Sequence, residues 1–332
     1  MITIGIIGLG FGKAAHIPAF QKDKRFKIIG VCSKNIDKAK KVSKEYNIDY
    51  YTDNSIDLID KVDAISIAIP PNDQKKILPI AIDKGKHIFF EKPLGYIPKK
   101  KNYLKKNQAL MINFEFLEID VWKKFSNILK SNEIGKVLHI NISWIVQTYS
   151  FANNTNSWKT NLNSGGGVIN NFSPHVFHYI ENIFGKIKKV STFPHNYKNT
   201  NRFVDVNLLL EKKISVNLSL SNDTFKGSGH KIEVTASKGT IILQNTHIDS
   251  VANFVLDIKS NNKKEIKLFS KLKRDDFSDQ RIGPMLRLVK RFGSWIEKGK
   301  ICRPNINDAV RNQKIINSVK KSYSSKKIVS IN

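Results

Sequence analysis

Two hydrophobic patterns divide the chain. In the first third, short and largely apolar runs alternate with mixed stretches rich in lysine; the runs are Ile2–Ile7, Phe26–Cys32, Ala64–Ile69, His87–Phe90 and Met111–Asn113. Apolar runs without alternation are typical of parallel strands that are buried on both faces. The stretches between them are long enough for crossover helices, so the pattern predicts an α/β fold with a doubly wound parallel sheet.

From Val137 onward the pattern changes to alternation with a period of two. Leu138, Ile140 and Ile142 fall on one side of the predicted strand, and His139 and Asn141 fall on the other. Short connections indicate an antiparallel sheet with one exposed face. The same alternation recurs at Val204–Leu210, Ile214–Leu220, Lys231–Ala236, Gly239–Leu243, Val255–Lys259 and Glu265–Leu268.

The tail returns to helix over Gly283–Lys298 and Asn307–Tyr323, and Ile328–Ile331 is predicted as an edge strand. We therefore divide the chain into two domains. Residues 1–117 form the parallel α/β domain, and residues 118–332 form an α+β domain with a mostly antiparallel sheet. The C-terminal helix is a candidate to pack back on the first domain.

A glycine-rich turn separates the first strand from the first helix. Gly8, Gly10, Phe11 and Gly12 lie in it, directly before Lys13. Strand, glycine turn and helix in this order predict a dinucleotide site, with Gly8 making the tight turn and Gly10 admitting a pyrophosphate at the helix N-terminus. The third position of the fingerprint is a lysine, and the alternative is a turn without a ligand.

The end of the second strand bears on the choice of cofactor. Ser33 and Lys34 lie about twenty residues beyond the glycines, where NAD-binding chains usually place an acid on the ribose hydroxyls. A hydroxyl beside an ammonium suits a 2′-phosphate instead, so we expect NADP(H) to be preferred, with NAD(H) as the alternative. The simpler interpretation is a solvated turn.

Two further strands deliver candidate residues to the same sheet edge. The strand that ends at Ile69 is followed by Pro70, Pro71 and Asn72, and the strand that ends at Phe90 is followed by Glu91, Lys92 and Pro93. Ligands of doubly wound sheets bind at the carboxyl ends of the strands. Partial burial there lowers the pKa of an ammonium and suits Lys92 to hold a substrate hydroxyl. A structural pair of Glu91 with Lys92 is the alternative.

The second domain contains one further segment with chemical potential. Ser164 and three glycines precede Asn171 and His175. A step of four residues places Asn171 and His175 on one helical face. Ser173-Pro174 also has the form of a helix start, in which case Asn171 precedes the helix. Histidine is the side chain best suited to take a hydroxyl proton near neutral pH.

Taken together, these motifs resemble the Gfo/Idh/MocA oxidoreductases, named for glucose–fructose oxidoreductase and inositol dehydrogenase. The resemblance rests on Gly8-x-Gly10, on Ala68 to Asn72, on Glu91-Lys92-Pro93, and on Gly165 to Gly167 followed by His175 and Gly185. It implies a Rossmann domain, a second domain with a large open sheet, and hydride transfer between NAD(P) and sugars, cyclitols or nucleotide sugars. A homodimer or homotetramer is also implied.

The resemblance assigns roles to individual residues. Ile69, Pro70, Asn72 and Glu91 would line the nicotinamide side, Lys92 would polarise the reacting oxygen, and His175 would take its proton.

This sequence departs from the family in the stretch after Pro93, Leu94 to Leu110, whose predicted helix is shorter than usual and unusually basic, and at three single positions. Asn171 stands where the family usually has Asp, Ser173 stands where it usually has Gly, and Glu115 stands where many members have a basic residue. Asn171 can orient a hydroxyl but cannot titrate. Either His175 and Lys92 carry out the acid–base work, or activity is weak. A cofactor-binding partner or regulatory protein without turnover is therefore the second hypothesis.

Composition narrows the classes of partner. Among 332 residues, 56 Lys and Arg oppose 28 Asp and Glu, a net charge of +28. The lysines are spread through all predicted elements, so we expect an anionic small substrate rather than a nucleic acid. No run reaches the ~18 apolar residues of a membrane span, and the N-terminus lacks a basic leader. Two cysteines provide neither a disulfide framework nor a metal site. We expect a cytoplasmic protein.

Overall fold

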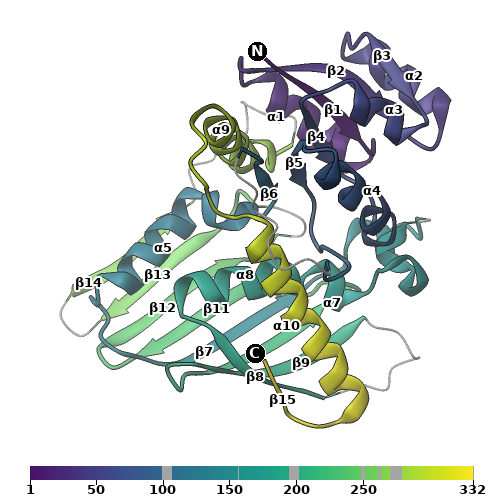
Figure 1. Ribbon diagram of the computed structural model, residues 1–332. Helices are drawn as coiled ribbons and strands as arrows, with labels where there is room; N and C mark the ends of the chain where they lie inside the picture. The colour runs from purple at the N-terminus through teal and green to yellow at the C-terminus, as the bar shows by residue number, and fades with distance from the viewer. Residues whose placement is uncertain are drawn as a thin grey trace. The chain divides into compact units, whose positions relative to one another are not determined.

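The structure is a computed structural model that describes residues 1–98, 107–155, 157–193, 202–247, 251–260, 263–269 and 279–331. The chain forms two compact units (Figure 1). One comprises Met1–Glu115 with Arg274–Arg311, and the other comprises Phe116–Lys273 with Asn312–Asn332. The chain first leaves the first unit for the second after Glu115, whereas the sequence placed the boundary after residue 117. The domain boundary at residue 117 stays a prediction.

In the first unit, the strands form a parallel sheet in the order β3-β2-β1-β4-β5-β6. The order reverses between β1 and β4, which makes the ends of these two strands the switch point where such sheets bind ligands. The strands are β1 (Ile2–Ile7), β2 (Phe26–Cys32), β3 (Tyr50–Thr52), β4 (Ala64–Ile67), β5 (His87–Phe90) and β6 (Leu110–Ile112).

The helices of this unit follow the strands as crossovers. The helical elements are a π-helical turn Gly12–His16, α1 (Ile17–Gln21), α2 (Ile36–Glu45), α3 (Ser55–Asp60), α4 (Pro71–Asp83) and α9 (Ile282–Lys298). The side chain of Asn35 accepts a hydrogen bond from the Lys38 N–H and that of Asn54 accepts one from the Ile56 N–H, so these two residues cap the N-termini of α2 and α3.

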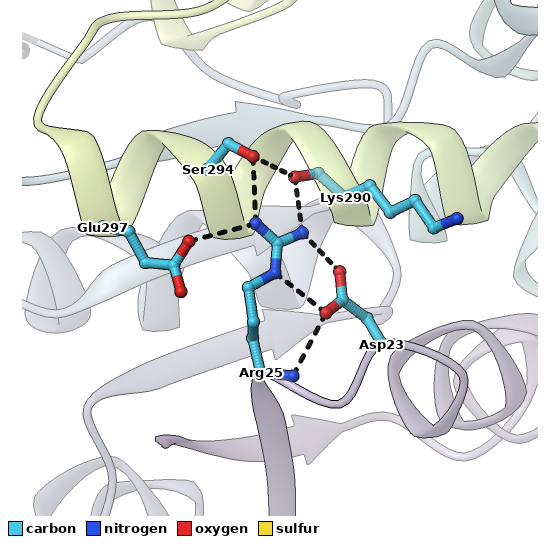
Figure 2. Close-up of polar contacts among 5 residues, drawn as sticks. All are labelled: Asp23, Arg25, Lys290, Ser294 and Glu297. Carbon is cyan, nitrogen blue, oxygen red and sulfur yellow. Dashed lines mark hydrogen bonds and ion pairs between the residues drawn. The ribbon is translucent and has the colours of Figure 1, made fainter.

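Arg25 connects α9 to the start of β2 (Figure 2). Its guanidinium donates to both carboxylate oxygens of Asp23. On α9 it donates to the Lys290 carbonyl at 2.7 Å, to the Ser294 hydroxyl at 2.9 Å and to Glu297 at 3.3 Å. This one side chain thus holds together two segments that lie about 265 residues apart in the chain.

Aromatic packing supports the same contact. Phe292 of α9 stacks on Phe26 with ring centroids 5.9 Å apart and an interplanar angle of 3°. Phe20 of α1 meets both rings edge-on. Because these rings are buried, α9 is part of the core of the first unit rather than an appendage.

In the second unit, the strands form a mixed, mostly antiparallel sheet in the order β14-β13-β12-β11-β7-β10-β9-β8-β15. The pairing of β7 with β10 is parallel, and the other pairings described are antiparallel. The strands are β7 (Val137–Ile145), β8 (Ile187–Phe193), β9 (Phe203–Leu210), β10 (Ser215–Ser221), β11 (Gly229–Ala236), β12 (Gly239–Asn245), β13 (Val255–Ser260), β14 (Lys263–Phe269) and β15 (Val329–Ser330).

One face of this sheet packs on helices and the other is exposed. Trp122, Ile180 and Val319, each from a different helix, share a core with inward residues such as Ile140 and Val216. The helices are α5 (Asp120–Lys130), α6 (Tyr149–Ala152), α7 (Val168–Asn171), α8 (Ser173–Ile183) and, from Asn312 onward, α10 (Ile306–Ser325), with short 3-10 turns at Glu115–Glu118, Trp158–Thr160 and Leu162–Ser164. The predicted fold class is confirmed in both units.

The structure differs from the sequence pattern at three strands, and one of them, the short β3, was not predicted. Leu138, expected on the inner face, is 53% exposed, because a bulge pairs Ala236 with Val137 and Thr235 with His139 and leaves Leu138 without a partner in the ladder. The strand β8 was not predicted. A register shift between Ile187 and Lys189 interrupts its alternation, so its apolar positions do not keep a period of two.

Candidate functional site

The glycine turn follows β1 and contacts the residues at the ends of the two neighbouring strands, β2 and β4. Gly8 donates its N–H to the Cys32 carbonyl at 2.9 Å, and its φ of +94° lies in the region that favours glycine. A Cβ at Gly8 would lie 2.4 Å from the Ala68 carbonyl oxygen and 2.7 Å from Ile69 Cγ2. The turn therefore packs directly on the segment that follows β4, and only glycine fits there.

Gly10 has the opposite surroundings. A Cβ built on it would meet no atom within 4 Å, so the backbone faces open space. Helical structure begins immediately afterwards, and N–H groups of a first helical turn bind anions. A closed turn at Gly8 and an open one at Gly10 fit a pyrophosphate. A Cβ at Gly12 would lie 3.3 Å from Ile6 Cγ2 and 3.4 Å from Ala68 Cβ, close to what an alanine would tolerate.

The predicted ribose residues lie at the end of β2. Lys34 is largely exposed, and its Nζ forms an ion pair with Asp73 Oδ2 at 2.8 Å. Ser33 Oγ accepts a hydrogen bond from the Asn35 N–H. Asp73 belongs to the first turn of α4. Lys34, which the sequence suggested as a ligand of a 2′-phosphate, is thus paired with the Asp73 carboxylate at the start of α4.

A buried polar network holds the segment after β5 in place. Glu91 Oε1 accepts hydrogen bonds from Asn113 Nδ2 at 2.6 Å and from His16 Nε2 at 3.1 Å. His16 Nδ1 lies 2.6 Å from Ser66 Oγ on β4. Gln74 Nε2 donates to the Glu91 carbonyl at 2.9 Å. Four elements therefore fix Glu91, and the half-buried Lys92 follows it directly.

The charges in this region are unevenly distributed between two buried carboxyl groups. Burial alone would raise the pKa of Glu91, but hydrogen bonds from His16 and Asn113 and the charge of Lys92 outweigh burial and lower it. Burial, followed by the charge of Glu91, raises the pKa of Glu115 to about 7. Glu91 is therefore the ionised member of the pair at neutral pH.

Arg281 brings α9 to the glycine turn. Its guanidinium lies over the Phe11 ring, with Cζ 4.5 Å from the ring centroid, and its Nε donates to Asp279 at 2.8 Å. It also lowers the pKa of Glu115, against the larger effect of burial. Phe11 in turn meets the His16 ring edge-on at 5.4 Å.

Sequence reasoning missed several members of this region. His16 was the one most open to prediction, because it lies one helical turn beyond the glycines and a buried polar side chain there needs a partner. Arg281 and Asn113 carry no local signal, since only tertiary contacts bring them to Phe11 and Glu91. The remaining members that were missed are Ser66 and Gln74, and Glu115 was noted only as a departure from the family.

The second unit places Asn171 and His175 close together on two consecutive helices. Asn171 ends α7, and His175 lies in the first turn of α8. The predicted cap is wrong: Ser173 is the first residue of α8, and its hydroxyl donates back to the Ile169 carbonyl. His175 is 5% exposed, and its ring meets that of Phe116 edge-on at 4.8 Å.

The first unit thus brings the predicted nicotinamide and pyrophosphate residues to one sheet edge, with Ser33 and Lys34 at the end of a neighbouring strand. Convergence of Lys92 with His175 stays a prediction, because one belongs to each unit. Among the described residues, no group of three or more His, Cys, Asp or Glu side chains could hold a metal ion. No described helix is long and apolar enough to cross a membrane.

Comparison with known proteins decides the family. Residues 2–114 match the NAD-binding Rossmann fold of the Gfo/Idh/MocA oxidoreductase family, and residues 127–331 match its C-terminal alpha/beta domain. The chain belongs to the Gfo/Idh/MocA family. The resemblance inferred from the glycine turn and Glu91-Lys92-Pro93 is confirmed, and the protein is an oxidoreductase of this family.

Individual members of the Gfo/Idh/MocA family are distant in sequence. An uncharacterized oxidoreductase of Synechocystis is 24% identical over 357 residues, which cover 99% of this chain and 96% of the relative. Glucose-6-phosphate 3-dehydrogenase of Bacillus subtilis is 28% identical over 153 residues, which cover 43% of this chain and 42% of the relative.

Solved structures share the fold over the full length. Levoglucosan dehydrogenase in complex with NADH and L-sorbose has a TM-score of 0.85 at 16% identity, covering 100% of this chain and 99% of that one. The 3-ketoreductase KijD10 from Actinomadura kijaniata, in complex with NADP, has a TM-score of 0.80 at 16% identity, with 97% and 98% covered.

Proposed function

We propose that the protein transfers a hydride between NAD(P) and a carbinol or carbonyl carbon of a sugar or nucleotide sugar. The observation that carries the proposal is the buried network of His16, Ser66, Asn113 and Gln74 around Glu91. It fixes Glu91, which Lys92 follows directly, at the carboxyl edge of the parallel sheet that also carries the glycine turn, and that turn is open at Gly10. Relatives named for glucose 6-phosphate and levoglucosan support a sugar substrate.

The residues of this chain divide the work as follows. Gly8, Gly10, Phe11 and Gly12 hold the pyrophosphate, and Ile69, Pro70, Asn72 and Glu91 line the nicotinamide side. A bound nicotinamide supplies or accepts the hydride. Lys92 binds and polarises the reacting oxygen, and His175, with Asn171 near it, takes the hydroxyl proton in the oxidative direction. Holding both reactants in one site accounts for much of the rate enhancement.

For the cofactor, we propose a preference for NADP(H), with NAD(H) as the alternative. Lys34 would turn from Asp73 to a 2′-phosphate, and Ser33 would donate its hydroxyl to it. A surface ion pair of this kind contributes about 0–1 kcal/mol, so a phosphate can replace its carboxylate partner at small cost.

Replacement of Lys92 tests the proposal. Turnover of reactive sugars, followed by nicotinamide absorbance, should fall by about a hundredfold or more in Lys92→Met, which is the scale of a lost acid–base group. Cofactor affinity should stay near that of the wild type. Lys75→Met, an exposed lysine on α4, is the matched control and should leave turnover unchanged. Unchanged turnover in Lys92→Met would remove Lys92 from the mechanism.

A second candidate is a cofactor-binding partner or regulatory protein without turnover, and the amide at Asn171 favours it. Tight NADPH binding with no turnover across sugars, sugar phosphates and nucleotide sugars would establish it. We also propose that the protein is cytoplasmic and forms a homodimer or homotetramer. Light scattering on the purified protein would measure its oligomeric state.

A further inference from the structure

Asn171 lies beside a fold in the backbone that precedes His175. The turns Trp158–Thr160 and Leu162–Ser164 run back over the glycine loop, and the Lys159 carbonyl accepts two hydrogen bonds there. One comes from the Gly167 N–H at 3.0 Å, and the other comes from Asn171 Nδ2 at 3.1 Å. The adjacent Asn170 Nδ2 donates to the Gly165 carbonyl at 2.8 Å. Two side-chain amides therefore hold two loop carbonyls.

The surroundings of these amides are rich in carbonyl oxygens. A Cβ at Gly166 would lie 2.2 Å from the Trp158 oxygen, 2.6 Å from the Lys159 oxygen and 2.8 Å from the Asn161 oxygen. Asn171 is 7% exposed. A carboxylate in its place would set a charged oxygen against the Lys159 carbonyl with no proton between them. Such a buried contact is unfavourable, because neither oxygen can donate.

We propose that Asn171 is a positioning residue: its amide N–H pins the segment 158–164 onto the glycine loop that leads into the helix of His175. The inference rests on the proposed function for its catalytic consequence. His175 then takes the substrate proton without a carboxylate at position 171, and the family's usual aspartate is incompatible with this loop. Asparagine in place of the family's aspartate at position 171 thus holds this loop through a hydrogen bond that a carboxylate could not make, and it does not mark the loss of a catalytic group.

Asn171→Asp gives the sharpest test, since an aspartic acid can donate a proton to the Lys159 carbonyl but an aspartate cannot. Burial and the facing carbonyl raise the pKa of the introduced carboxyl. Its stabilising form is therefore present at low pH and lost as the pH rises. The variant should melt about 4–8 °C below the wild type near pH 8 and recover as the pH falls toward about 5.

Two further variants isolate this effect. Asn171→Leu has a similar shape and no donor, so it should lose stability at every pH. The titratable residues of the surrounding segments, Lys159, His175 and His178, are the same in both variants, so the difference between the two pH profiles isolates the introduced carboxyl. Asn207→Asp, on the exposed face of the sheet, adds the same charge and should leave the melting temperature unchanged.

The KM of the sugar and the Kd of NADPH, measured separately, distinguish a positioning role of Asn171 from a general effect on stability. Near pH 8, Asn171→Asp should raise the KM of the sugar by about tenfold while the Kd of NADPH stays unchanged, and lowering the pH should narrow that difference. The opposite result, wild-type stability at all pH values with faster turnover in Asn171→Asp, would overturn the proposal. The melting experiments need no substrate, so they decide the role of Asn171 even if the proposed function fails.

Discussion

Gly293 lies in the interior of α9, where alanine would normally be the better residue by about 1 kcal/mol. The structure predicts that Gly293→Ala nevertheless destabilises the first unit. A Cβ at this position would lie 2.7 Å from Arg25 Cζ and 2.9 Å from its Nη2, so the guanidinium must move away from the helix (Figure 2).

The magnitude follows from the contacts that would be lost. Arg25 donates to the Lys290 carbonyl, to Ser294 and to Glu297, and hydrogen bonds of charged groups contribute about 1.5–3 kcal/mol each. The bond to Glu297 is long and exposed, so we count the first two at the low end, which gives about 3 kcal/mol. After subtraction of the gain in helix propensity, the net loss is about 2 kcal/mol.

The assay is a thermal melt in a double-mutant cycle. In the wild-type background, Gly293→Ala should lower the melting temperature by about 4–8 °C for a unit of this size. In an Arg25→Ala background the clash is gone, so the same change should stabilise by about 1 kcal/mol. Stabilisation in both backgrounds would refute the assignment of Gly293 to the space that Arg25 occupies.

Three further predictions concern the cofactor site. Because burial raises the pKa of Glu115 from its ordinary value of 4.5 to about 7, its protonation in the folded state adds stability that is fully present below about pH 4.5 and is lost as the pH rises to about 7. Glu115→Gln should abolish this decline in pH-dependent melts; parallel curves for the two proteins would contradict it. Gly10→Val should keep the melting temperature but weaken NAD(P)H binding by about tenfold or more, as measured by fluorescence titration, because its side chain enters the space of the pyrophosphate. Lys34→Ala should lower NADPH affinity about fivefold and leave NADH affinity unchanged, whereas Asp73→Asn should raise NADPH affinity because it frees the Lys34 ammonium. Equal losses of affinity for both cofactors in Lys34→Ala would place Lys34 away from the phosphate.

The sequence was sufficient for the parts of the fold that depend on local pattern. The buried runs became the parallel strands, and the alternating runs became strands with a polar outer face, because side-chain period reports burial directly. The pattern failed where a bulge broke that period, at Leu138 and in β8. Neither irregularity contains a glycine, which is the residue that most often signals a bulge in a sequence.

In the candidate site, too, residues with a local sequence signature could be predicted, and residues that depend on tertiary contacts could not. Gly8 and Lys92 could be found because turn conformation and strand ends have sequence signatures. His16 and Asn113, which hold Glu91, depend on contacts between residues 22 and 75 positions apart. The role that we propose for Asn171 was also hidden from the sequence, since it depends on a backbone carbonyl twelve residues earlier.

The most direct measurement of the proposed function follows the hydrogen itself. The protein is incubated with keto sugars and keto nucleotide sugars, whose carbonyl carbon can accept a hydride, and with NADPH or NADH that carries deuterium at the transferable position, and the products are examined by mass spectrometry. The proposal predicts deuterium on a single sugar carbon with the wild-type protein and its loss in Lys92→Met with the cofactor still bound. Transfer by Lys92→Met at the wild-type rate, or tight cofactor binding by the wild type with no transfer to any sugar, would contradict it.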